Sequence, residues 1–192
     1  MVSTAKENHM SDFENRQAWD LGAWPEMFEK AKELLAMIFS GPPDIQTNRM
    51  VFTIASLTAG CRHCQAHGAY GLDKAGVELA KIQALWTFES SELFTDRERA
   101  ALRFGVAAAS VPNSVTSEHH RDLRAHFSDV EVRTLIGVVS VAGFMNRYND
   151  SLATVTGAAS ADWAAEHLAS VGWDIGKHVG APHEQRADPP GS

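Results

Sequence analysis

Apolar side chains recur every three or four positions along most of the chain, which is the spacing of amphipathic helices. The first such stretch has Pro25 in a position that suits a first helical turn, and Gly41 follows its end. No segment of the sequence shows the long apolar–polar alternation of β-strands, so we predict an all-α fold of about seven to eight helices. The predicted helices cover residues 25–40, 44–58, 61–76, 79–86, 96–110, 117–127 and 129–154, with a last one after Ser160 that ends at Gly172.

Two of these helix starts carry a second, independent signal. Thr95 and Glu98, and again Ser128 and Glu131, have the spacing of a capping box, in which each residue satisfies the other's unpaired backbone donor. The most apolar run, residues 135–145, lies on the helix that the second box begins. It is far shorter than the roughly 20 residues that a bilayer helix needs, so we predict a buried core helix and no membrane association.

The helical pattern is continuous over residues 21–179, which predicts one compact domain. Residues 1–20 are polar without a sustained period, and residues 180–192 are rich in proline, glycine and charge. We therefore expect a loosely ordered N-terminal segment and a disordered C-terminal tail.

Composition narrows the class of protein. The 192 residues are 44% hydrophobic and 21% charged, as in a globular chain, and carry a formal net charge of −7. This acidic balance argues against nucleic acid or an anionic membrane as a partner, because both favour a basic surface. The N-terminus has no basic segment leading into an apolar one, so we expect a cytoplasmic location, where two cysteines are more often a redox or metal pair than a stabilising disulfide.

The candidate chemistry lies in the sequence GCRHCQAH, residues 60–67. On a helix, Cys61 and Cys64 share one face with Cα atoms roughly 5–6 Å apart, a separation that a disulfide tolerates. The positive end of the helix dipole favours a thiolate in the first turn, and His67 is placed to accept a thiol proton as a general base. The spacing does not fix which cysteine attacks, since Cys61 is nearer the helix start and Cys64 is nearer His67.

Two other interpretations of this pair remain. Zinc could be held by the cysteines together with His63 and His67, although ligands crowded into one and a half helical turns cannot easily surround a metal, and no second C-x-x-C follows. The cysteines could also be a purely structural pair. His63 points away from Cys64 and is more simply a wall or surface group. We predict a reactive dithiol that needs neither a cofactor nor a metal.

Residues 48–71, NRMVFTIASLTAGCRHCQAHGAYG, resemble the core of the alkylhydroperoxidase AhpD-like family, in the carboxymuconolactone decarboxylase superfamily. The segments FTDRERAALRF and LIGVVSVAGFMNRYND also resemble later helices of that family. The resemblance implies an all-α homo-oligomer in which Cys64 is the peroxidatic thiol and Cys61 resolves it. It also implies recycling by an external dithiol, such as a lipoyl or thioredoxin-like protein.

The chain departs from the family pattern at two positions. The family's histidine stands four residues after the second cysteine, where this chain has Gly68, with His67 one place earlier. The family's proton-relay glutamate stands twelve residues before the first cysteine, where this chain has Arg49, which cannot act as a base. The candidate neighbours of the site that replace this glutamate are Arg49, Asp44, Glu89 and Asn146.

The leading hypothesis is a cofactor-free thiol peroxidase that reduces small-molecule hydroperoxides through a Cys61–Cys64 disulfide, with His67 as proton acceptor. One alternative keeps the fold but predicts a decarboxylase-like lyase acting on a small acid or lactone. A second alternative is a non-catalytic, redox-sensing helical oligomer. In each case the expected assembly is a homo-oligomer, either a dimer, a trimer or a hexamer.

Overall fold

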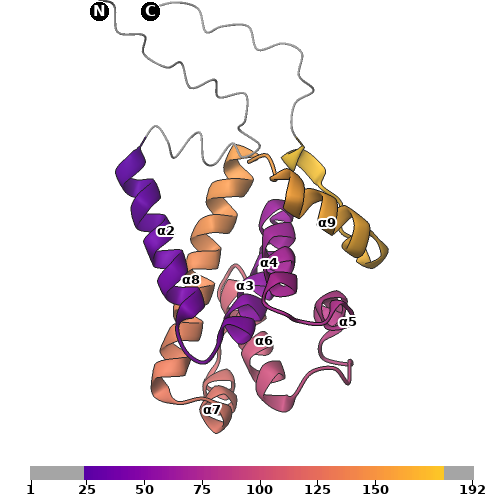
Figure 1. Cartoon of the computed structure of the whole chain (residues 1–192). Helices are drawn as coiled ribbons and strands as arrows, with labels where there is room; N and C mark the ends of the chain where they lie inside the picture. Colours follow the sequence, from indigo (N-terminus) through magenta and orange to yellow (C-terminus); the bar gives the residue numbers. More distant parts are fainter. Residues whose placement is uncertain (1–23, 180–192) are drawn as a thin grey trace, which may run out of the picture.

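The computed structural model describes residues 24–179, and within that range it contains helices and no strand, which confirms the all-α prediction (Figure 1). The predicted N-terminal segment, residues 1–20, and the tail, residues 180–192, lie outside the described residues. The helices are α2 (Pro25–Ser40), α3 (Ile45–Ala59), α4 (Arg62–Lys74), α5 (Leu79–Gln83), α6 (Asp96–Ala109), α7 (Ser117–His126), α8 (Asp129–Leu152) and α9 (Ala158–Leu168), with 3-10 turns η2 (Ala84–Thr87), η3 (Ala169–Val171) and η4 (Gly176–His178).

The helix ends follow the local signals that the sequence carries. Both predicted capping boxes are present, at Thr95 for α6 and at Ser128 for α8. Gly60 ends α3 with φ +78°, a left-handed conformation that glycine adopts without strain. The chain turns sharply there, so that Cys61 becomes the N-cap of α4.

Two predicted helices differ from the observed ones. The predicted helix over residues 79–86 is α5 followed by the 3-10 turn η2. The last helix begins at Ala158, before Ser160, and its N-cap Gly157 supplies no side-chain cap. Ser160 lies inside α9, where its hydroxyl is 3.0 Å from the His67 Nδ1.

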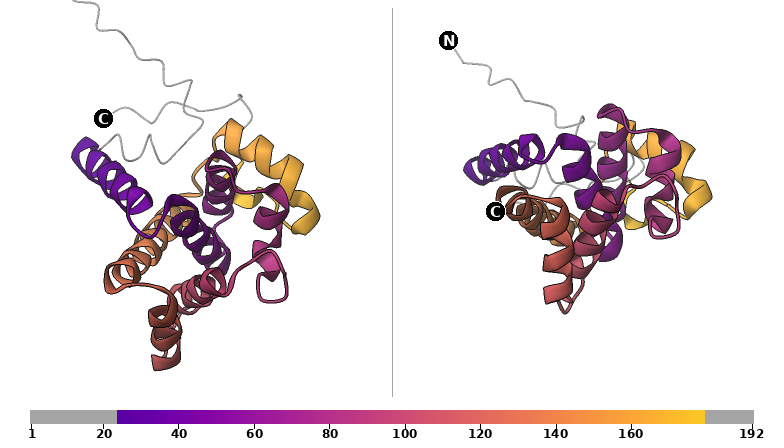
Figure 2. Two further views of the ribbon diagram at one scale, coloured as in Figure 1. Left: turned by 60° about the horizontal axis from the view of Figure 1, so that its bottom comes forward. Right: turned by 90° about the horizontal axis from the view of Figure 1, so that it is seen from below.

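The central helix of the fold is α3, which packs against α4, α6 and α8 (Figure 2). On its other side α4 is covered by α9. The helix α8 is buried along one face, where Leu135, Val138 and Ala142 are fully buried, while Ile136 and Phe144 are exposed. The prediction of a buried core helix therefore holds for one face of α8. Within residues 24–179 no helix combines the length and the apolar character needed to cross a membrane.

Candidate functional site

The two cysteines meet at the start of α4, as the spacing predicts. Cys61 is the N-cap and Cys64 lies in the first turn, and their sulfur atoms are 2.8 Å apart. Both thiols are free, and both side chains are buried. The separation is longer than the roughly 2.05 Å of a disulfide bond, so the pair is a hydrogen-bonded dithiol that needs little movement to form one.

The surroundings of the two sulfurs are unequal. The hydrogen bond to the Cys64 side chain lowers the pKa of Cys61, and the backbone N–H of Cys64, 3.3 Å from the Cys61 Sγ, acts in the same direction. Burial raises the pKa of Cys64 well above its ordinary value. A single negative charge on the pair is therefore favoured at Cys61, at the positive end of α4.

His67 lies on the same helix but is engaged elsewhere. Its Nδ1 is 3.0 Å from the Ser160 Oγ, and its ring lies against His63 with centroids 4.4 Å apart. In the described part of the chain no hydrogen bond joins His67 to either sulfur, and its buried Nε2 has no hydrogen-bond partner. The role of His67 as proton acceptor stays a prediction.

Burial keeps both histidines of α4 neutral. It lowers the pKa of His67 to about 4, and burial together with the neighbouring His67 and His178 lowers the pKa of His63 to about 2. His63 is a buried wall group, with Nδ1 3.3 Å from the Thr156 Oγ1. The sequence left open whether His63 lines a wall or the surface, and the structure selects the wall.

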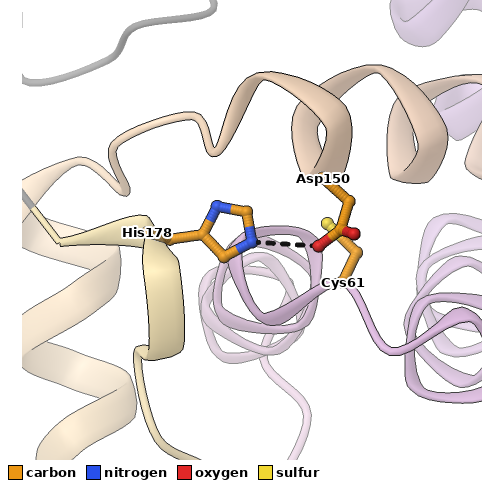
Figure 3. A group of neighbouring side chains, drawn as sticks. All are labelled: Cys61, Asp150 and His178. Carbon is orange, nitrogen blue, oxygen red and sulfur yellow. Dashed lines mark ion pairs between the residues drawn. The ribbon is translucent and has the colours of Figure 1, made fainter.

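A carboxylate lies beside the dithiol at Asp150, near the end of α8, a residue that was not among the sequence candidates. Its carboxylate, the Cys61 sulfur and a ring nitrogen of His178 in η4 all lie within 4.8 Å of one another (Figure 3). Two of the candidates are engaged elsewhere: Asp44 caps α3 through Thr47, and Glu89 pairs with Arg103.

A second contact ties the same end of α8 to the dithiol. The Asn149 Nδ2 lies 3.6 Å from the Cys64 Sγ and also donates to the Met145 carbonyl at 2.9 Å. No spacing rule links Asn149, Asp150 or His178 to the C-x-x-C sequence. Only the packing of α8 and of the segment around η4 against α4 brings them together.

Arg49 does not replace the missing relay glutamate. Its guanidinium lies 4.6 Å from the centre of the Phe39 ring and fills the space beside Gly71. Gly71 follows Cys64 by two turns of α4, roughly 10 Å along the axis. Burial lowers the pKa of Arg49, and its charge lies away from the sulfurs.

Packing also explains why a histidine is absent from position 68. A Cβ atom on Gly68 would lie 2.5 Å from the Thr53 Oγ1 on α3. The close approach of α3 and α4 therefore leaves no space for a side chain at the family's histidine position.

A groove of about 910 Å³ lies beside the site and has Asp150 in its lining. Its walls come from the ends of α3 and α6 and from α8, and they include apolar Phe104 and Val139 beside Asn146, Arg147 and Asp150. The amide of Asn146 is buried and has no hydrogen-bond partner among residues 24–179. Asp150 belongs both to the groove lining and to the Cys61 cluster, whereas neither cysteine lines the groove.

Comparisons with known proteins agree with this fold. No protein-family model and no curated protein matches the chain. The solved structure of the debrominase Bmp8 is similar, with 26% sequence identity over 76% of this chain and 79% of that chain, and a TM-score of 0.70. A cysteine-to-alanine variant of Bmp8 in complex with 2,3,4-tribromopyrrole has 25% identity, the same coverage and a TM-score of 0.71.

A protein of unknown function from Agrobacterium tumefaciens, provisionally assigned as an antioxidant defence protein AhpD, is also similar. It has 23% identity over 68% of this chain and 90% of that chain, with a TM-score of 0.65, a likeness that concerns the fold. Helices, caps and structural similarity agree with the resemblance found in residues 48–71. The chain therefore has an AhpD-like, all-α fold.

Proposed function

We propose that this chain is a thiol oxidoreductase that reduces small organic hydroperoxides through Cys61 and Cys64. The observation that carries the proposal is the hydrogen-bonded pair of free sulfurs, 2.8 Å apart at the start of a helix. A dithiol at this separation can pass two electrons to an acceptor and close to a disulfide without moving the backbone. The groove beside Asp150 provides space for a small organic molecule with apolar and polar parts.

The chemistry balances without another oxidant. A thiolate of the pair attacks the distal peroxide oxygen, the O–O bond breaks, and the alkoxide takes a proton and leaves as an alcohol. The second sulfur then attacks the resulting sulfenic acid, and the S–O bond breaks as the S–S bond forms. Hydroxide leaves with the remaining proton as water. The dithiol is oxidised by two electrons and the peroxide is reduced by two.

Turnover requires a reductant, for which we propose an external dithiol, carried by a lipoyl or thioredoxin-like protein. Its thiolate attacks the Cys61–Cys64 disulfide to give a mixed disulfide, which its second thiol resolves. This exchange restores both cysteines and leaves the reductant as a disulfide.

The experiment that tests the peroxidase proposal is intact-mass measurement of the reduced protein after one equivalent of cumene hydroperoxide. We expect a loss of two hydrogens in the wild type and no such loss in Cys61→Ser or Cys64→Ser. Arg103→Ala, on the surface and paired with Glu89, serves as a matched control that should oxidise like the wild type. Two thiols that remain free after hydroperoxide treatment at neutral pH would overturn the proposal.

A second candidate reaction is reductive dehalogenation, which the similarity to Bmp8 and its tribromopyrrole complex favours. A thiolate would take the halogen from carbon as a sulfenyl halide, and the carbanion would be protonated. Attack by the second thiolate on this sulfur would then give the disulfide and release halide. Ion chromatography of bromide released from 2,3,4-tribromopyrrole distinguishes the two candidates, because the peroxidase proposal expects oxidation by hydroperoxide without bromide release from the pyrrole.

A further inference from the structure

Three side chains with metal-binding atoms converge beside the dithiol, from segments that are distant in the sequence. Cys61 comes from the start of α4, Asp150 from the end of α8 and His178 from η4. One ligating atom of each lies within 4.8 Å of the other two, and Figure 3 shows the three groups directed toward a common point. Sulfur, imidazole nitrogen and carboxylate oxygen are the donor types that bind zinc.

His178 is held in the orientation that metal binding requires. Its side chain is 1% exposed, and its Nδ1 is 2.8 Å from the Thr154 carbonyl oxygen, which can only accept a hydrogen bond. The Nδ1 therefore carries a proton, and in the neutral imidazole the Nε2 then presents a lone pair. In metal sites, a ligating histidine is commonly fixed in this way by a backbone carbonyl. Among residues 24–179 the buried Nε2 has no hydrogen-bond partner.

The distance between the His178 and Asp150 side chains matches that of two ligands bound to one metal ion. The Nε2 is 3.4 Å from the Asp150 Oδ1 (Figure 3). A charge-assisted hydrogen bond would be about 2.7–2.9 Å long. Two ligands of a tetrahedral ion with bonds of roughly 2.0–2.1 Å stand about 3.3–3.4 Å apart.

Neighbouring groups also orient the other two ligands, Asp150 and Cys61. The Lys177 Nζ binds the Asp150 Oδ2 at 2.8 Å, which leaves Oδ1 turned to His178. Cys61 is fully buried and receives the Cys64 backbone N–H at its sulfur, which orients the Sγ and stabilises its anionic form.

We propose that Cys61 Sγ, Asp150 Oδ1 and His178 Nε2 form a binding site for a thiophilic divalent cation of the Zn²⁺ class, with the fourth position left to solvent. Binding releases the Cys61 thiol proton to solvent and changes no oxidation state. A sulfur and a nitrogen ligand disfavour Mg²⁺ and Ca²⁺, which prefer oxygen. This set differs from the zinc alternative considered from the sequence, because His63 and His67 are not in it.

The site shares Cys61 with the dithiol, so metal binding and disulfide formation exclude each other. A bound cation engages the Cys61 sulfur and protects the pair from oxidation, whereas a Cys61–Cys64 disulfide removes the thiolate ligand. Metal affinity is measured on the reduced protein alone and does not depend on whether a hydroperoxide is a substrate.

The test uses the reduced, full-length protein under anaerobic conditions. Co²⁺ titration should give a thiolate-to-cobalt charge-transfer band together with the visible bands of a tetrahedral ion, and one equivalent of Zn²⁺ should abolish both. We expect Asp150→Asn and His178→Gln each to weaken Zn²⁺ binding by at least about tenfold. Cys61→Ser should remove the charge-transfer band, and the disulfide form should bind no cobalt.

The matched control is His67→Gln, which changes a partly buried histidine of the helix that Cys61 caps but lies outside the ligand set. Its Zn²⁺ affinity should stay within about threefold of the wild type. Circular dichroism separates a lost ligand from a lost fold, and the two conservative variants, Asp150→Asn and His178→Gln, provide independent measurements. The proposal is wrong if the wild type binds less than one equivalent of Zn²⁺ or if both variants bind it as tightly as the wild type.

Discussion

Cys61 and Cys64 are chemically alike and three residues apart, but their positions on α4 separate their protonation states. Cys61 stands outside the helix as its N-cap and accepts a backbone N–H, whereas Cys64 lies inside the first turn, and both side chains are buried. The resemblance assigns the first attack to Cys64. The local electrostatics place the thiolate at Cys61, since burial opposes a charge on Cys64.

Single serine variants test this difference. In Cys64→Ser the new hydroxyl can still donate to the Cys61 sulfur, so the thiolate is retained, whereas Cys61→Ser leaves only the buried Cys64. We expect sulfenic acid to form at least about tenfold faster in Cys64→Ser, because the thiolate is the reactive species. Dimedone trapping followed by mass spectrometry measures both rates. Faster trapping in Cys61→Ser would assign the attack to Cys64, as the resemblance implies.

The neutral histidines of α4 make the stability of the protein dependent on pH. His63 and His67 have pKa values of about 2 and about 4 in the folded protein, against roughly 6.5 when unfolded. Between the folded and unfolded pKa values the unfolded chain binds more protons than the folded one. The free energy of unfolding therefore has its full value above about pH 6.5 and decreases as the pH falls below that. At about pH 5 the expected loss is about 2 kcal/mol per histidine.

Urea unfolding at neutral pH and near pH 5 measures this loss. His67→Gln should lose about 2 kcal/mol less than the wild type between the two conditions, because it lacks one of the titrating rings. Ser160→Ala, which removes the hydrogen-bond partner of His67 but keeps the imidazole, is the control and should retain the wild-type pH dependence. Equal losses in His67→Gln and the wild type would contradict the neutral, buried state of His67.

At the level of helices, the site depends on how closely α3 and α4 approach. Gly68 allows Thr53 to lie against the backbone of α4, and Gly71 does the same for the guanidinium of Arg49. Both departures from the family pattern, at positions 49 and 68, therefore lie at this helix interface. Both departures have a packing explanation, since side chains on α3 occupy the space that the glycines of α4 leave open.

A double-mutant cycle at this interface tests the packing. Gly68→Ala should lower the free energy of unfolding by about 1–3 kcal/mol, because its Cβ would meet the Thr53 Oγ1 at 2.5 Å. The same substitution should cost less in a Thr53→Ala background, where that oxygen is gone. Gly137→Ala in α8, whose Cβ would be 3.8 Å from its nearest neighbour, is the control and should be neutral or stabilising. An equal cost of Gly68→Ala in both backgrounds would show that Thr53 is not the obstacle.

At the level of the whole molecule, the described helices leave several large apolar side chains in contact with solvent. Met37 on α2 is 63% exposed, and Phe144 on α8 is 42% exposed. Burial of such side chains between copies is a common source of association energy. These side chains are consistent with the homo-oligomer that the resemblance implies.

Light scattering after size-exclusion chromatography measures the assembly. We expect a native mass of two, three or six times the 20.9 kDa of one chain, at micromolar concentration. The measurement is made in the reduced and in the oxidised form, since a redox-sensing oligomer would change its mass without turnover. A mass of one chain in both forms would contradict the expected homo-oligomer.

Features that depend on neighbours within one or two helical turns could be predicted from the amino-acid pattern. Helix periodicity, the capping boxes at Thr95 and Ser128, and the meeting of Cys61 with Cys64 are local properties, since residues three positions apart at a helix lie on one face. For the same reason His67 was placed correctly on α4, but its partner Ser160 belongs to another helix and was not predicted.

The groups that surround the dithiol depend on how the helices pack. Asp150 and His178 reach Cys61 only because α8 and η4 pack beside α4, and no periodicity in the sequence records that approach. The close contact of Thr53 with Gly68 and the position of Arg49 over the Phe39 ring likewise depend on distances between helices. Side-chain packing in the folded interior fixes such distances. The local sequence pattern therefore specifies the reactive pair, and the groups around it follow from the packed structure.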